Sequence, residues 1–82
     1  MTPTERKVLD FVGKEFLQGE TAGLTVQTKL LELNVLDSLA VMVLLSFIEK
    51  DLGVVINLED IGADSLRDVS TIAALVDEKL GK

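Results

Sequence analysis

Residues 30–52, LLELNVLDSLAVMVLLSFIEKDL, contain the pattern that decides the fold of this chain. Asp37 and Ser38 are both favourable residues for a helix N-terminus, and a nearly continuous apolar run follows them. Apolar residues recur at helical spacing until Gly53, which is a suitable stop. The pattern therefore predicts a helix that begins at Asp37-Ser38 and runs to Gly53.

The N-terminal residues predict an earlier helix. Thr2-Pro3-Thr4-Glu5 has the form of a capping box, with proline at the first helical position, where its missing N–H costs nothing. Val8, Val12 and Phe16 follow at a four-residue spacing, and a glycine that can end the helix comes soon after. We expect this helix over roughly residues 3–18.

The remaining segments predict connections and further helices. Residues 19–37 form a long connection rich in Leu and Val, which we expect to pack on the core. Residues 54–56 are β-branched but have no strand to pair with, so extended chain is expected there. A short helix around residues 64–68 precedes a last helix, which we expect from Ser70, as its N-cap, to about Leu80. The fold class predicted is all-α.

The composition limits the chemistry that the chain can perform. Its 82 residues suit one domain, and 48% hydrophobic residues are enough for a core. Without Cys or His there is no disulfide, no thiolate metal site and no imidazole base. We therefore expect a single domain over residues 1–82 that is not an enzyme.

The charge distribution indicates the kind of partner. The net charge is −6, and residues 32–68 hold eight acidic side chains but only two basic ones. Such a field repels nucleic acid and attracts basic protein surfaces, although acids of this kind also serve solubility alone. The longest apolar stretch, residues 39–48, is much shorter than the ~20 residues that span a bilayer, and no signal peptide is recognisable. We expect a cytoplasmic protein that binds neither nucleic acid nor membrane.

The segment from Leu30 to Leu39 resembles the approach to the modified serine of acyl, peptidyl and D-alanyl carrier proteins, with Asp37-Ser38-Leu39 at its centre. The resemblance covers essentially the whole chain. It implies a free-standing carrier: a four-helix carrier-protein bundle with a long first loop and a short third helix. It also implies that a phosphopantetheinyl transferase attaches 4'-phosphopantetheine from coenzyme A to Ser38, with Asp37 and Leu39 beside the arm.

The chain contains the Asp-Ser-Leu triplet twice, since Asp64-Ser65-Leu66 repeats it. A serine before an apolar helical run is ordinarily only an N-cap, so the triplet alone does not identify a modified residue. Forty-four residues follow Ser38, whereas the seventeen after Ser65 are too few for the two further helices of the carrier fold. We therefore expect modification at Ser38 and none at Ser65.

The second helix departs from that of fatty-acid carrier proteins, which present a row of acids immediately after the triplet. Ala40 and Val43 stand where the early acids would be expected. Helix geometry places Met42 and Val43 outward, although an apolar helix face is often core, and that alternative stays open. The expected partner-binding residues are Leu39, Met42, Val43, Ser46 and Glu49.

The resemblance implies a function as a carrier that holds acyl or aminoacyl groups as thioesters. The apolar second helix resembles that of free-standing carriers of natural-product pathways, or of the D-alanyl carrier type. This resemblance implies a pathway of polyketide or nonribosomal-peptide type, with loading by an adenylating ligase and use by downstream synthase or tailoring enzymes. An alternative is an acyl carrier protein of fatty-acid or polyketide elongation, which accepts malonyl units from an acyltransferase. A non-carrier helical protein-binding module is the alternative from another class. We expect a monomer.

Overall fold

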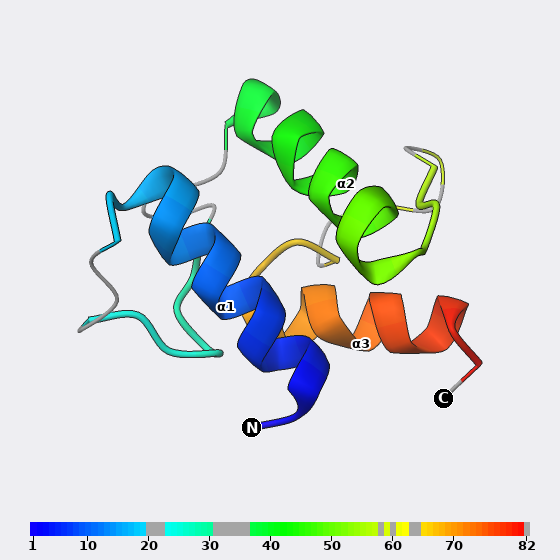
Figure 1. The fold of residues 1–82 in the computed structure, drawn as a ribbon, viewed down its shortest axis with the longest axis horizontal. Coiled ribbons are helices and arrows are strands. Elements are labelled where there is room, and N and C mark those ends of the chain that lie inside the picture. The colour runs from blue at the N-terminus through cyan, green and yellow to red at the C-terminus, as the bar shows by residue number, and fades with distance from the viewer. Residues whose placement is uncertain (20–22, 31–36, 58, 60, 63–64, 82) are drawn as a thin grey trace.

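Three α-helices make up the regular structure in a computed structural model of the chain, which describes residues 1–19, 23–30, 37–57, 59, 61–62 and 65–81 (Figure 1). They are α1 (Pro3–Phe16), α2 (Ser38–Leu52) and α3 (Val69–Lys79). No residue within these described ranges is in a β-strand. The all-α fold class is confirmed. No helix in the described part of the chain is long and apolar enough to cross a bilayer.

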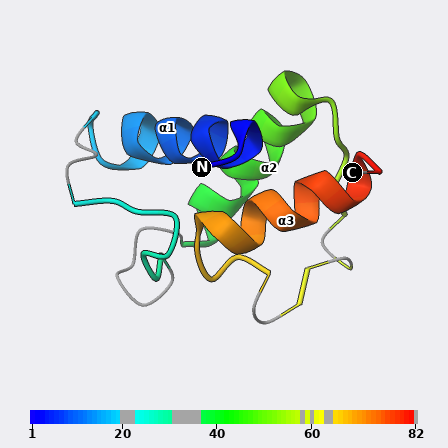
Figure 2. The same ribbon diagram turned by 90° about the horizontal axis from the view of Figure 1, so that it is seen from below.

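One core joins the three helices, whose arrangement is shown in two views (Figures 1 and 2). α1 packs on α3, and the Thr4 hydroxyl donates a hydrogen bond of 2.7 Å to the Asp77 carboxylate between them. The largest fully buried side chains come from each helix and from the connection before α2: Val8, Val12, Leu30, Leu44, Ile48, Val69, Ile72 and Val76.

The bounds of α1 and α2 follow from local capping signals. The Thr2 hydroxyl accepts the Glu5 N–H, and the Glu5 carboxylate accepts the Thr2 N–H, so the predicted capping box is confirmed. α1 ends two residues before the expected limit. Asp37 caps α2, and Gly53 ends it in the left-handed conformation at φ 71°, as glycine readily does. The predicted extent of α2 is confirmed.

The N-cap of α3 is Asp68, so the prediction of Ser70 as its cap is wrong. The Asp68 carboxylate accepts the Thr71 N–H at 2.9 Å, and the Thr71 hydroxyl accepts the Asp68 N–H at 3.1 Å. This reciprocal pair is a capping box that begins two residues earlier than expected. The Ser70 N–H is bound to the Val26 carbonyl at 2.9 Å instead.

The long connection before α2 packs on the core where the structure describes it. Leu24 and Leu30 are buried, and the Leu30 N–H donates to the Arg67 carbonyl at 2.9 Å. The other apolar residues expected to pack here, in 31–36, lie outside the described residues. This contact joins the connection to the segment just before α3.

The short helix expected around residues 64–68 is not confirmed. Residue 64 lies outside the described residues, and residues 65–68 form a turn and a bend. Residues 54–56 are in neither a helix nor a strand, in agreement with the absence of strand pairing expected there, with Val54 and Ile56 buried and Val55 exposed. These segments connect α2 to α3.

Candidate functional site

Ser38 is the first residue of α2, and its side chain is exposed. Asp37, not Ser38, is the N-cap, because its carboxylate accepts the Ala40 N–H at 2.8 Å. Ser38 is therefore not the N-cap of α2. The Ser38 hydroxyl makes no hydrogen bond to the described part of the chain, which leaves its oxygen accessible for esterification.

The electrostatic environment of Ser38 favours an anion. The N-terminus of a helix carries a partial positive charge and backbone N–H groups without intrahelical partners. The first turn of α2 itself contains no acidic side chain, and the carboxylate of the preceding Asp37 is hydrogen-bonded to the Ala40 N–H. An arm attached through a phosphodiester therefore fits the chemistry of this helix end.

Ser65, in the second Asp-Ser-Leu triplet, is placed differently. It is half-buried in a turn, where its Oγ accepts the Gly62 N–H at 2.9 Å and its own N–H donates to the Gly62 carbonyl at 3.2 Å. Leu66 after it is buried, and Asp64 before it lies outside the described residues. Ser65 thus lacks both the free hydroxyl and the helix N-terminus of Ser38.

The outer face of α2 is apolar at its N-terminal end. Leu39 is 73% exposed, Met42 53% and Val43 37%, whereas Leu44 and Ile48 on the opposite side are fully buried. Met42 and Val43 are therefore not core residues. The same exposed side of the helix carries Ser46 and Glu49.

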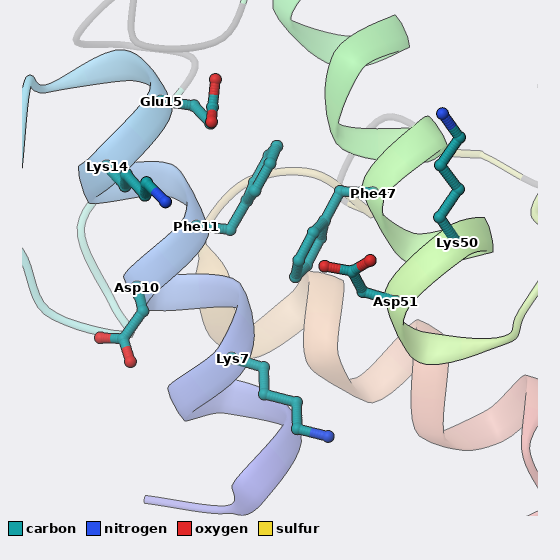
Figure 3. A pocket seen from close by; sticks show the side chains of 8 residues that line it. All are labelled: Lys7, Asp10, Phe11, Lys14, Glu15, Phe47, Lys50 and Asp51. Carbon is teal, nitrogen blue, oxygen red and sulfur yellow. The ribbon is translucent and has the colours of Figure 1, made fainter.

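Two grooves lie between α1 and α2. The first, of about 410 Å³, borders the N-terminus of α2 and is lined by Glu15, Phe16, Asp37, Leu39, Ala40 and Val43. The second, of about 780 Å³, is shown in Figure 3. Its walls come from α1 and α2 and contain Lys7, Asp10, Phe11, Lys14, Glu15, Phe47, Lys50 and Asp51.

Phe11 and Phe47 both line the second groove and face each other there (Figure 3). Their ring centroids are 4.0 Å apart and their planes differ by 15°, so the rings stack. The sequence alone singles out neither phenylalanine. Their pairing depends on how two distant helices pack, and periodicity within one helix carries no such information.

No three acidic side chains gather as a metal-binding group in the described parts of the chain. The residues around Ser38 instead offer one exposed hydroxyl, one helix N-terminus and an apolar surface. This arrangement can hold a covalent group and present it to another protein.

Comparisons with known proteins agree with this arrangement. Residues 7–78 match the family model described as "Phosphopantetheine attachment site". The chain is 36% identical over 72 residues to the "Probable acyl carrier protein PigG" of Serratia sp., a match that covers 88% of this chain and 83% of that relative. It also matches a chain in a solved structure described as "Crystal structure of FAD-dependent dehydrogenase", with a TM-score of 0.77 and 37% identity. That match covers 83% of this chain and 96% of the other.

Proposed function

The chain belongs to the phosphopantetheine attachment-site family, and from this membership we propose that Ser38 is the residue to which its arm is attached. Members with the acyl carrier function are not enzymes; they hold a covalent 4'-phosphopantetheine. The support for Ser38 is its exposed hydroxyl at the start of α2, which makes no hydrogen bond to the described residues, whereas Ser65 is half-buried and hydrogen-bonded in a turn. We propose a single, monomeric carrier domain over residues 1–82.

The residues around Ser38 would hold the arm in distinct ways. The hydroxyl of Ser38 supplies the ester oxygen, and the free N–H groups of the first turn of α2 stabilise the phosphate. Leu39 and Met42 flank the attachment point with exposed apolar side chains. The arm supplies the thiol that this cysteine-free chain lacks, on which acyl groups are held as thioesters.

The partner surface in this proposal is the exposed side of α2. It has an apolar centre at Leu39, Met42 and Val43, with Glu49 at its far end. Partner interfaces commonly combine an apolar centre with charges at the rim that steer association. This composition supports docking of a phosphopantetheinyl transferase and of an adenylating ligase that loads an acyl or aminoacyl group.

A natural-product pathway is the setting that we propose, in the cytoplasm where coenzyme A is available. One solved chain that matches this one is no longer than a carrier domain, since the aligned part makes up 96% of it, yet its structure is described as that of an FAD-dependent dehydrogenase. That description supports a flavin-dependent dehydrogenase as one class of downstream partner. Such a partner would oxidise the cargo while the carrier holds it.

The decisive experiment is intact-mass measurement after incubation with coenzyme A and a broad-specificity phosphopantetheinyl transferase. A carrier gains the mass of one phosphopantetheine, and the same reaction without coenzyme A gives no gain. A folded chain that stays unmodified would contradict the proposal and favour a helical protein-binding module. Mass spectrometry of the thioester on protein from the native host would then separate an aminoacyl cargo from a malonyl one.

A further inference from the structure

The smaller of the two α1–α2 grooves lies directly beside Ser38. Asp37 and Leu39, the neighbours of Ser38 in the sequence, both line it, together with Ala40 and Val43 from the first two turns of α2. The Ser38 side chain itself is exposed. A protein that covers the Ser38 hydroxyl therefore also covers part of this groove.

The opposite wall of this groove comes from the last turn of α1, where Glu15 and Phe16 line it. Phe16 is partly buried against the core, whereas Glu15 is exposed. In Figure 3, Glu15 and Phe11 extend from α1 toward the side on which α2 lies. Because Glu15 is far from Ser38 in the sequence, only the packing of α1 beside α2 brings its carboxylate into the surroundings of the serine.

The charge of this groove is one-sided. Among the described residues that line it, Glu15 and Asp37 are charged, and both are acidic. The Asp37 carboxylate accepts the Ala40 N–H, whereas the Glu15 carboxylate makes no hydrogen bond or ion pair with the described residues. The three lysines that line the larger groove do not line this one. Glu15 is therefore free to pair with a cation that another molecule supplies.

The modification of Ser38 brings an anion to the same place. The phosphates of coenzyme A are negatively charged, and the one that is transferred to Ser38 must approach beside two carboxylates, which repel it. An Arg or Lys side chain between phosphate and carboxylate removes this repulsion, because both groups bind such cations. An enzyme that modifies Ser38 therefore gains from a cationic side chain at this groove.

We propose that this groove is part of the docking surface for the phosphopantetheinyl transferase, and that it receives an Arg or Lys side chain of that enzyme, which pairs with Glu15. The proposal rests on the function proposed for Ser38. The aliphatic part of the side chain packs on Leu39 and Val43, which are 73% and 37% exposed. The groove volume of about 410 Å³ is within the range of small-molecule sites, so one long side chain fits.

This assignment extends the docking surface from α2 onto α1. The first turn of α2 contains no acidic side chain, and the Asp37 carboxylate is engaged in capping. Glu15 thus supplies a charge for steering that the start of α2 lacks. A charge at the rim of an interface acts mainly on association and on its salt dependence.

The test measures the kinetics of Ser38 modification by coenzyme A and the broad-specificity transferase while the concentration of the carrier is varied. Glu15→Lys should lower kcat/KM roughly tenfold, mainly through a higher KM, and Glu15→Gln should lower it about threefold. Since Glu15 is exposed, both variants should stay folded, which circular dichroism will show. Glu78→Lys makes the same change in net charge at an exposed position of α3 outside the grooves described, and should stay within about twofold of wild type.

Salt dependence separates pairing from shape. Added NaCl should lower kcat/KM of the wild type more steeply than that of Glu15→Gln, because the variant has lost the charge that salt screens. Equal losses in Glu15→Lys and Glu78→Lys, or unchanged kinetics in both folded Glu15 variants, would overturn the proposal. A wild-type chain that stays unmodified would instead contradict the function proposed above.

Discussion

The carboxylate of Asp37 accepts a hydrogen bond of 2.8 Å from the backbone N–H of Ala40, and this bond fixes the start of α2 directly before Ser38. An N-cap of this kind satisfies one of the N–H groups that a helix leaves without an internal partner. It leaves the Ser38 side chain outside the capping interaction and exposed to solvent. The aspartate of the triplet therefore positions the serine that we propose to be modified.

Replacement of Asp37 tests this positioning role. Asp37→Ala should lower the free energy of unfolding by about 1 kcal/mol, because it removes the N-cap acceptor of α2. Asp37→Asn keeps an oxygen that can accept the Ala40 N–H and should cost much less. Urea denaturation followed by circular dichroism measures both values. An equal loss in the two variants would show that the hydrogen bond is not what stabilises the helix start.

The duplicated triplet gives a prediction about the site of modification. Ser38→Ala should abolish the mass gain with coenzyme A and a phosphopantetheinyl transferase, because it removes the exposed hydroxyl at the start of α2. Ser65→Ala removes the acceptor of the Gly62 N–H and should cost about 1 kcal/mol of stability, yet still allow full modification. Intact mass measures modification in both variants. Modification of the Ser38→Ala protein would move the site to another residue.

A third prediction concerns the exposed face of α2. Met42→Glu and Val43→Glu should each change the free energy of unfolding by only about 0.5 kcal/mol, since both side chains are exposed. Each should lower kcat/KM for the phosphopantetheinyl transferase and for the loading ligase by roughly tenfold, or about 1.4 kcal/mol, if the apolar centre is the docking surface.

Val55→Glu is the matched control for that prediction. Val55 is 61% exposed but follows the end of α2, outside the proposed docking face. It should leave kcat/KM close to the wild-type value. The same loss in all three variants would mean that added negative charge, and not a particular surface, impairs the partners.

The features that could be predicted from the sequence are those that depend on residues close together along the chain. The limits of α2 could be predicted because Asp37 and Gly53 are capping residues at its two ends. The position of Ser38 at the helix start followed from the same signals. The exposure of Met42 followed from helix geometry once the register was set.

The features that the sequence missed depend on contacts between distant segments. The stacking of Phe11 on Phe47 needs the relative placement of α1 and α2, which no local pattern contains. At α3, Asp68 and Ser70 are both acceptable N-caps, and local propensity does not choose between them. Tertiary structure chooses, because Asp68 is buried and the Ser70 N–H is bound to Val26 of the connection before α2.

The choice of cap at α3 yields the last prediction. Asp68 is only 4% exposed, and its carboxylate accepts the Thr71 N–H and contacts the Arg67 guanidinium at 3.3 Å. Asp68→Ala removes the cap and leaves a backbone donor without a partner, so it should destabilise the protein by about 2 kcal/mol. Since the Ser70 side chain makes no hydrogen bond within the described structure, Ser70→Ala should change stability by about 0.5 kcal/mol or less. Urea denaturation measures the free energy of unfolding of both variants. A larger decrease for Ser70→Ala than for Asp68→Ala would show that Ser70, and not Asp68, is the N-cap that stabilises the start of α3.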